Sequence, residues 1–316
     1  MSKKNRIVTV TMNPAIDLAC TVSDFTAGKV NRVESYQTDA AGKGVNIAVL
    51  LRKFGLPVTV TGFLGQDNAG IFEKMFREQG LEDWFVRVPG ETRIGIKVLD
   101  PRTETTTDIN FPGLAPDMGH VEELTAAIEK LAAEASIVVI GGSLPATVGP
   151  ETVGELVTVI REQGAKPVVD TSGPALRSAV DSVPWLIKPN DDELAELVGR
   201  PLKTISEIAR ESWRMNRSGI ANVVISLGAR GALFVNDEEE LFATPPEIEP
   251  VSTVGAGDAM IGGLVAGTAL GLSFRERVRL ATALSAATVA QAAPSLENLD
   301  RARKLEDRVT IETISL

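Results

Sequence analysis

The chain has 316 residues, of which 44% are hydrophobic, so it can bury the core of one large α/β domain or of two smaller ones. Its formal net charge of −10 at pH 7 argues against nucleic acid and anionic membranes as main partners, because both select basic surfaces. One cysteine and one histidine exclude a disulfide framework, a Cys/His zinc site and a Ser-His-Asp triad, which leaves carboxylates, lysines, arginines and backbone groups for any chemistry.

The N-terminal segment carries Lys3, Lys4 and Arg6 before an apolar stretch, as a signal peptide does. Polar residues between Thr9 and Asp17 interrupt that stretch too early for a signal peptide, so we expect no export signal. The longest uncharged stretch, 259–274, is shorter than the about 20 residues that a membrane-spanning helix needs. We therefore expect a soluble cytoplasmic protein with no membrane partner.

Short β-branched runs alternate with helical patterns in the first part of the chain. The sequence predicts a strand at 7–10, a helix at 45–54 ended by Gly55, a strand at 58–63, and a helix at 69–79 ended by Gly80. This order is the βαβ rhythm of a parallel sheet.

The same rhythm resumes after residue 136. We expect a strand at 137–140, a helix at 151–163 closed by Gly164, and strands at 167–169, 185–187 and 223–226. These strands are almost wholly apolar, which fits a sheet covered on both faces. A buried helix is expected at 259–272, within a stretch of two consecutive helices at 255–293.

Two segments, 21–39 and 91–110, read as alternating strands without a following helix. We expect them to form a small β lid, spanning about residues 18–40 and 91–112, that closes over the site and offers a surface for a homodimer. Cys20 lies between apolar neighbours there and is expected to be a core thiol. No linker divides the chain, so residues 1–316 are expected to form a single domain that carries this lid.

The stretch 252–260, STVGAGDAM, combines a Gly-Ala-Gly turn with one carboxylate at the start of an apolar run. Gly255 and Gly257 allow successive N–H groups to face one side, and the first turn of a helix adds further free donors, so the stretch predicts an anion site. Asp258 among these donors is suited to remove a proton from an attacking hydroxyl. The alternative is that Asp258 only caps the helix.

Further polar motifs follow predicted strands, where an open α/β sheet places its ligands. In NPAID, Asp17 can accept hydrogen bonds from sugar hydroxyls, or the motif is only an Asx turn around Pro14. In AAGKGVN, the glycines allow close approach of a ligand and Lys43 supplies charge, or the segment is a plain loop before a helix.

KPNDDE follows the strand at 185–187, and Asn190 with Glu193 makes an Asn variant of the capping box, a structural function that can coexist with ligand binding. SLGARG follows the strand at 223–226 and suits nucleotide phosphates, although it would also serve as an ordinary turn between strands. The P-loop and dinucleotide-binding motifs are absent from the sequence, as are the protein-kinase signatures.

Taken in order, NPAID, AAGKGVN, GGSLP, KPNDDE, SLGARG and STVGAGD resemble the ribokinase-like, or PfkB-type, family of carbohydrate kinases over essentially the whole chain. The resemblance implies an α/β fold of three layers, α/β/α, with a mostly parallel central sheet and a small β lid. It also implies ATP and Mg²⁺, and phosphorylation of a sugar hydroxyl with Asp258 as general base.

The resemblance assigns the remaining site residues in four groups. The anion hole around the base comprises Gly255, Ala256 and Gly257. The sugar would contact Asp17, Gly42, Asn46 and Arg93. Beside the resemblance, a phosphosugar needs a cationic pocket, which Arg93 with Lys43, and Lys29 or Arg32 from the lid, could form. The nucleotide would contact Lys188, Asn190, Ser226, Leu227, Gly228, Ala229, Gly231 and Thr253. The metal would lie near Glu193.

Within the family, AAGKG, TRIGIKV, TDINFPG and VSTVGAGDAMIGGL are most similar to kinases that convert fructose 1-phosphate to fructose 1,6-bisphosphate. Gly95 departs from the family pattern, in which an asparagine often follows T-R-I. The alternatives are kinases of fructose 6-phosphate or tagatose 6-phosphate, then of an unphosphorylated acceptor such as ribose or a nucleoside. A non-catalytic sugar-phosphate sensor is a remote alternative, because Asp258 and Glu193 are both present.

Overall fold

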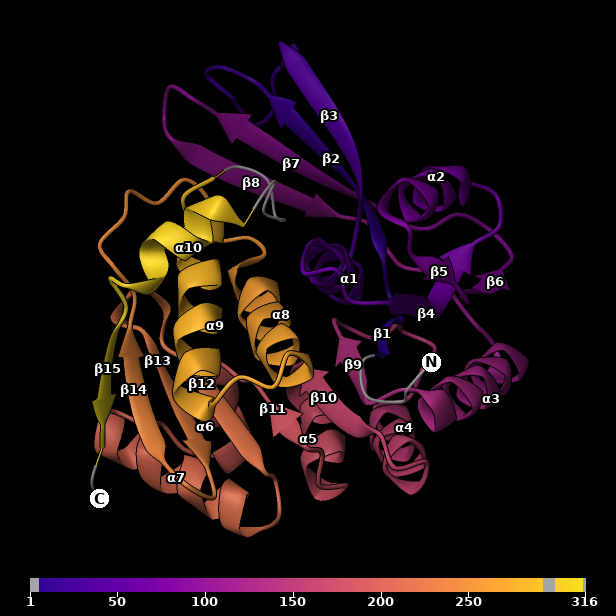
Figure 1. Cartoon of the computed structure of the whole chain (residues 1–316). Coiled ribbons are helices and arrows are strands. Elements are labelled where there is room, and N and C mark those ends of the chain that lie inside the picture. Colours follow the sequence, from indigo (N-terminus) through magenta and orange to yellow (C-terminus); the bar gives the residue numbers. More distant parts are fainter. Residues whose placement is uncertain (1–5, 292–298, 315–316) are drawn as a thin grey trace.

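The computed structural model describes residues 6–291 and 299–314, and its largest element is a sheet with the strand order β15-β14-β13-β12-β11-β10-β9-β1-β4-β5, in which β6 also pairs with β4 (Figure 1). Eight strands are parallel: β1 (Ile7–Thr11), β4 (Val58–Gly65), β5 (Glu82–Asp83), β6 (Val86–Val88), β9 (Ile137–Gly141), β10 (Lys166–Asp170), β11 (Leu186–Ile187) and β12 (Asn222–Ser226). The last three add antiparallel: β13 (Ala232–Asn236), β14 (Glu240–Thr244) and β15 (Thr310–Thr313). The mostly parallel sheet predicted from the apolar runs is confirmed.

Helices cover both faces of this sheet and make three layers (Figure 1). One face is covered by α1 (Lys43–Lys53), α2 (Gly70–Gln79), α8 (Ala256–Ala269), α9 (Phe274–Val289) and α10 (Asp300–Glu306). The other is covered by α3 (Met118–Glu134), α4 (Glu151–Glu162), α5 (Gly173–Asp181), α6 (Asp191–Val198) and α7 (Ile205–Arg217). Neighbouring strand residues belong to opposite clusters, as Ile7 and Val8 do, because side chains alternate across a strand.

The helix ends follow the glycines that the sequence singled out. Gly80 ends α2 in the left-handed conformation with φ 64°, which glycine adopts without steric cost. The predicted helix at 259–272 is correct in type but begins three residues earlier, because Gly255 takes φ 81° and lets α8 start at Ala256. The second predicted helix is α9, and the end of the predicted stretch lies outside the described residues.

The central helix α8 packs closely on both of its neighbours through glycine. A Cβ atom at Gly262 would lie 2.6 Å from Cδ2 of Leu50 in α1, and one at Gly263 would lie 2.6 Å from Cα of Ala281 in α9. Small residues at these points let the helix axes approach. The close approach of α8 to α1 matters for the site, because it brings together the N-terminal turns of both helices.

A second sheet, β3-β2-β7-β8, forms the lid that projects from the body at the top of Figure 1. Its strands are β2 (Ala15–Thr21), β3 (Ser35–Ala41), β7 (Ile94–Asp100) and β8 (Thr105–Asn110). The first of these strands, β2, starts directly after the turn that follows β1. Cys20 is buried in a small apolar cluster with Val22 and Val98, as expected of a core thiol.

None of the helices in residues 6–291 and 299–314 combines the length and the hydropathy of a membrane-spanning segment.

Candidate functional site

The parallel strands deliver most of the predicted site residues to one edge of the sheet. β1, β9, β10, β11 and β12 run in the same direction, so the segments that follow them lie at their common carboxyl edge. Asn13, after β1, donates through Nδ2 to Oγ of Ser143 in the GGSLP segment after β9, at 3.1 Å. Two motifs that are 130 residues apart in sequence therefore meet at this edge.

Asp258 lies in the first turn of α8 and is only 7% exposed. Gly255 precedes the helix, and Ala256 and Gly257 are its first two residues, so their N–H groups belong to the set that a helix leaves without intrahelical partners. A Cβ atom at Gly257 would lie 3.2 Å from Nζ of Lys188, which puts a lysine ammonium group directly against this turn. The predicted base, the donors and a cation are thus adjacent.

Asn46 of α1 donates through Nδ2 to Oδ2 of Asp258 at 2.8 Å. The two residues are 212 positions apart, and the packing of Leu50 against Gly262, one turn further along each helix, brings them together. The resemblance assigned Asn46 to the sugar, and the sequence did not predict its contact with the base.

Asp170, the last residue of β10, was missed by the sequence analysis. Its side chain is 1% exposed, and Nζ of Lys43 and Nζ of Lys188 each lie 3.3 Å from its Oδ1. Burial acts to raise the pKa of Asp170, but the ammonium groups of Lys188 and Lys43 hold it below its ordinary value. Its position could have identified it as a site residue, because Asp170 directly follows a predicted apolar strand, as the other polar motifs follow theirs.

These four charges set the protonation of the site. Burial, and then the nearby Asp170 carboxylate, raise the pKa of Asp258 to about 6, against the hydrogen bond from Asn46 and the charges of Lys43 and Lys188. Although burial opposes it, the carboxylates of Asp170 and Asp258 raise the pKa of Lys43. Asp258 is therefore largely ionised at neutral pH while remaining basic enough to accept a proton.

The predicted nucleotide residues lie at the ends of β11 and β12. Asn190 and Glu193 form the expected capping box: Oδ1 of Asn190 accepts from Glu193 N at 2.7 Å, and Oε2 of Glu193 accepts from Asn190 N at 2.8 Å. Asn190 also forms a bridge with Ser226. The two motifs are therefore in contact.

The SLGARG segment forms a short 3₁₀ turn, Gly228–Arg230, between β12 and β13. Gly231 has φ 113°, and a Cβ atom there would lie 2.2 Å from the carbonyl oxygen of Ala243, so this position requires glycine. Leu227 is buried, whereas Gly228 and Ala229 are exposed. Thr253 is exposed in the segment before α8, and its carbonyl oxygen lies 3.4 Å from Ala256 N.

The predicted sugar residues come from β2, the loop into α1 and the segment before β7. Gly42 precedes α1 with φ 147°, and a Cβ atom there would lie 2.7 Å from Thr11, so the loop packs on the end of β1. Nε of Arg93 is buried with no hydrogen-bond partner among the described residues. Asp17 pairs with Lys97, a lid residue that the sequence analysis also missed.

Lys29 is not joined to the other candidates by any contact in the described part of the chain. It is exposed in the loop between β2 and β3, and only its backbone groups are hydrogen bonded, to Thr26 and Asn31.

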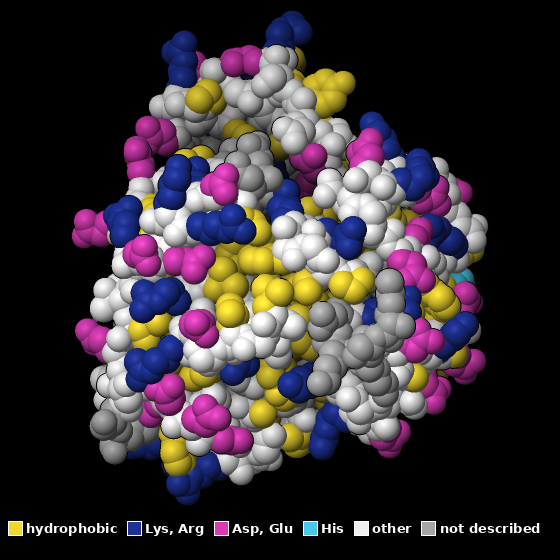
Figure 2. Space-filling view, in the orientation of Figure 1, with side chains coloured by type: hydrophobic (Ala, Val, Ile, Leu, Met, Phe, Trp, Pro, Cys, Tyr) yellow, Lys and Arg dark blue, Asp and Glu magenta, His cyan; other side chains and the backbone are white. Residues whose placement is uncertain are grey.

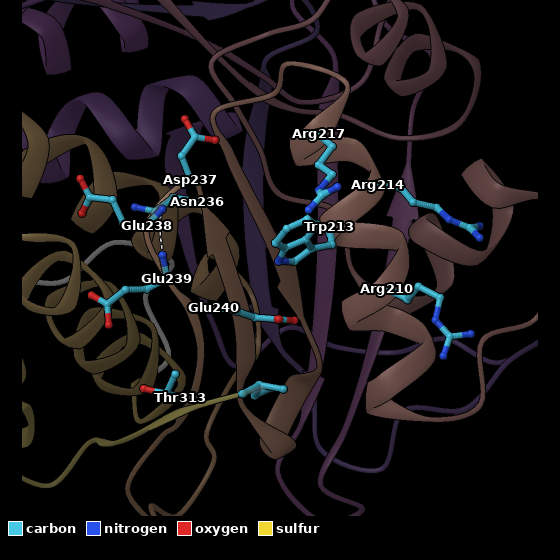
Figure 3. Close-up of a pocket in the computed structure, with 11 residues that line it drawn as sticks. Arg210, Trp213, Arg214, Arg217, Asn236, Asp237, Glu238, Glu239, Glu240 and Thr313 are labelled. Atoms are coloured by element: carbon cyan, nitrogen blue, oxygen red, sulfur yellow. Dashed lines mark hydrogen bonds between the residues drawn. The ribbon is translucent and has the colours of Figure 1, made fainter. Parts of the chain in front are cut away.

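A pocket of about 810 Å³ lies elsewhere, between α7, the β13–β14 hairpin and β15, and contains none of the predicted site residues (Figure 3). Its wall includes Trp213, Asn236 and Glu240. Asn236 pairs with Asn222 at the start of β12, whereas Ser226 ends that strand, so this pocket is at the opposite edge of the sheet from the candidate site.

Comparisons with known proteins agree on one family. The family model described as pfkB family carbohydrate kinase matches residues 4–300. The chain is 41% identical to a 1-phosphofructokinase of Rhodobacter capsulatus, with 98% of each chain covered, and 37% identical to a 1-phosphofructokinase of Vibrio cholerae, with 99% of this chain and 98% of the relative covered. Among solved structures, phosphofructokinase-2 from Escherichia coli in complex with fructose-6-phosphate is similar with a TM-score of 0.89 and 27% identity, covering 96% of this chain and 99% of that one.

Proposed function

The chain belongs to the pfkB family of carbohydrate kinases, and we propose that it transfers a phosphoryl group from ATP to fructose 1-phosphate and forms fructose 1,6-bisphosphate. The observation that carries the chemical part is Asp258, a buried carboxylate in the first turn of α8 with a pKa of about 6. The substrate is inferred from the two 1-phosphofructokinases, which match nearly the whole chain.

Asp258 removes the proton from the acceptor hydroxyl as that oxygen attacks the γ-phosphorus of ATP, and ADP leaves with the electrons of the broken P–O bond. The N–H groups of Gly255, Ala256 and Gly257 stabilise the negative charge of the phosphoryl group in transit. A positioned general base is typically worth about 10² to 10⁴ in rate. Positioning and charge stabilisation provide most of the remaining catalysis in phosphoryl transfer.

The nucleotide binds along the ends of β11 and β12. Lys188, beside the first turn of α8, neutralises phosphate charge, and the glycine-containing turn after β12 lets the nucleotide approach the backbone. The residues we assign to this side are Lys188, Asn190, Ser226, Leu227, Gly228, Ala229, Gly231 and Thr253.

The carboxylates suit Mg²⁺ bound through the nucleotide rather than a preformed metal cage. No group of three His, Cys, Asp or Glu side chains within residues 6–291 and 299–314 could hold a metal by itself. Asp170 oxygens are buried without a hydrogen bond of regular geometry, and Glu193 has one oxygen free of the capping box. Mg²⁺ commonly takes one or two carboxylates and completes its shell with phosphate and water. When bound, it would neutralise charge on the phosphates, with Glu193 and Asp170 as its protein ligands.

The sugar phosphate needs cations in a protein with a net charge of −10. Arg93 is the strongest candidate, because its buried Nε has no acceptor among the described residues and a phosphate oxygen would supply one. Lys43 would act as a cation for both the sugar phosphate and the nucleotide, and Lys29 would add positive charge from the lid. Asp17, Gly42 and Asn46 complete the sugar side.

The lid also supports a homodimer. Its sheet and loops expose the large hydrophobic side chains Val30, Val33, Tyr36 and Ile109 with exposed fractions between 45% and 85%. Figure 2 shows hydrophobic side chains at the surface of the lid. Exposed apolar groups of this size on a small sheet are suited to a second copy of the chain. We propose a single domain over residues 1–316 whose lid, about residues 18–40 and 91–112, carries this interface.

The test is ADP release by purified protein with a panel of fructose 1-phosphate, fructose 6-phosphate, tagatose 6-phosphate, fructose and ribose. The proposal expects the highest kcat/KM for fructose 1-phosphate, and it expects Asp258→Asn to lower kcat by about 10² to 10⁴. A tenfold higher kcat/KM for another compound would overturn the assignment of fructose 1-phosphate as the substrate but would still support a kinase. Binding of a phosphosugar without turnover of any would instead support a sensor.

A further inference from the structure

Asp17 and Lys97 form an ion pair inside the lid, on neighbouring strands. Nζ of Lys97 lies 2.5 Å from Oδ2 of Asp17, and the two side chains are 24% and 20% exposed. Asp17 of β2 is directly opposite Gly95 of β7, and Lys97 is two residues further along β7, so all three are on the same face of the lid. That face is the one whose aspartate we place at the sugar.

The two oxygens of Asp17 differ in their surroundings. Oδ2 is held by Lys97. Oδ1 faces Gly95, where a Cβ atom would lie only 2.9 Å away, so the absence of a side chain at position 95 keeps this oxygen uncovered. In the described residues Asp17 accepts no other hydrogen bond through its side chain. One oxygen is therefore anchored, and the other has no hydrogen-bond partner among the residues that the structure describes.

Lys97 also offsets negative charge on the lid face that carries Asp17. Register places Asp39 opposite Asp17, and Asp108 opposite Lys97, so this face of the lid carries three carboxylates. An anionic phosphosugar approaching them would be repelled. The ammonium group of Lys97 offsets part of that charge next to the carboxylate that we assign to the sugar.

We propose that Lys97 is a positioning residue: it holds Asp17 through Oδ2, so that Oδ1, above the bare backbone of Gly95, accepts a hydrogen bond from a hydroxyl of the phosphosugar. This inference deepens the proposed function and rests on its assignment of Asp17 to the sugar. It also concerns the departure at Gly95, since a Cβ atom at this position would lie 2.9 Å from the accepting oxygen.

The first test is steady-state kinetics of Lys97→Met, which keeps the length of the side chain and removes its charge. We expect KM for the phosphosugar to rise about tenfold or more, because a hydrogen bond to a charged group is lost or misaligned, while KM for ATP stays within twofold. Lys97→Arg should recover part of the loss. Lys74→Met is the matched control, since Lys74 is exposed on α2 and, in the described part of the chain, pairs only with Glu78. Equal increases in both KM values would overturn the proposal.

The second test asks whether Lys97 acts through Asp17. In a double-mutant cycle, Lys97→Met should have little further effect on KM in an Asp17→Asn background, whereas the full effect in that background would refute the coupling. Gly95→Ala should raise KM for the phosphosugar by about tenfold with Lys97 unchanged, because its methyl group crowds Oδ1. An unaltered KM would show that Oδ1 is not the acceptor. Thermal unfolding of each variant separates these effects from loss of the fold.

A failure of the Lys97 proposal can be distinguished from a failure of the proposed kinase function. The kinetic tests use whichever phosphosugar the wild-type protein phosphorylates best in the panel, so a different substrate leaves them valid. If no sugar is turned over, the kinase proposal fails, and the same variants are compared by calorimetric binding of fructose 1-phosphate. Unchanged affinity of Lys97→Met in that measurement would overturn the positioning proposal.

Discussion

Asp258 and Asp170 are two buried carboxylates with opposite pKa shifts in one site. The pKa of Asp258 is raised to about 6, first by burial and then by Asp170, whereas Lys188 and Lys43 keep the pKa of Asp170 low despite its burial. Their environments therefore separate a proton acceptor from a carboxylate that stays ionised. This separation is what a general base beside a charge-balancing group requires.

The first prediction concerns pH. A base must be deprotonated, so kcat/KM should fall as pH drops through about 6. Asp170→Asn removes the nearby negative charge and leaves Lys43 and Lys188 facing Asp258, so the acid limb should move to lower pH. Because the substrate phosphate also titrates near pH 6, the readout is the difference between variants rather than the absolute position. Asp192→Asn, an exposed acid in the first turn of α6, is the control. An acid limb of the kcat/KM profile that is unchanged in Asp170→Asn, or that moves to higher pH, would contradict the assignment of Asp258 as the general base.

The second prediction concerns Asn46. Asn46→Ala removes the donor that stabilises the charged form of Asp258, so the acid limb should move to higher pH by about one pH unit. A residue that only contacted the sugar would raise KM without moving the limb. The pH profile of kcat at saturating sugar distinguishes the two outcomes.

At the scale of elements, the third prediction concerns the packing of α8. Gly263→Ala would bring a methyl group to 2.6 Å from Cα of Ala281, a backbone atom that cannot turn aside. We expect a loss of about 1–3 kcal/mol in the free energy of unfolding, measured by urea denaturation. Gly70→Ala at the start of α2, where a Cβ atom would meet nothing within 4 Å, should instead be neutral or stabilising by up to about 1 kcal/mol. Equal stabilities for the two variants would argue against close α8–α9 packing.

The elements that the sequence predicts well are those with a local signal. β1 and β9 are apolar at every position except Thr9, Thr11 and Gly141, and they are the two central strands of the parallel sheet. The capping box of Asn190 and Glu193 was readable because both partners lie within one helical turn. By contrast, β13 to β15 were not predicted. β13 and β14 pair with the preceding strand through short turns, a local signal that was not used, whereas β15 pairs with β14 from a distant part of the chain, which a single sequence does not specify.

The site divides in the same way. Glycines and charged residues at the ends of strands could be named from the sequence, since their motifs are contiguous. The contacts of Asn46 with Asp258, of Lys97 with Asp17, and of Asp170 with both lysines join residues far apart in the chain. Such pairs follow from helix packing and strand register, which a single sequence does not specify.

At the scale of the molecule, the fourth prediction concerns assembly through the lid. Tyr36 is opposite Cys20, and Ile109 is opposite Ile96, so both project from the lid face that carries the small apolar cluster, away from Asp17. Tyr36→Asp combined with Ile109→Asp should convert a dimer to a monomer in sedimentation velocity, because it places charge in an apolar interface. Thr106→Asp on the opposite face is the control. A wild-type monomer, or a double variant that still dimerises, would exclude this interface.

The four charges around Asp170 have a consequence for how substrates arrive. Lys43 and Lys188 offset Asp170 and Asp258, so the centre presents no surplus attraction, while the whole protein carries a net charge of −10. Diffusional encounter with two anionic reactants is then opposed at long range, in contrast to the electrostatic steering found in enzymes with cationic funnels. Salt screens this repulsion, so binding of the sugar phosphate should become faster. We therefore expect kcat/KM to increase as the ionic strength is raised from a low to a physiological value.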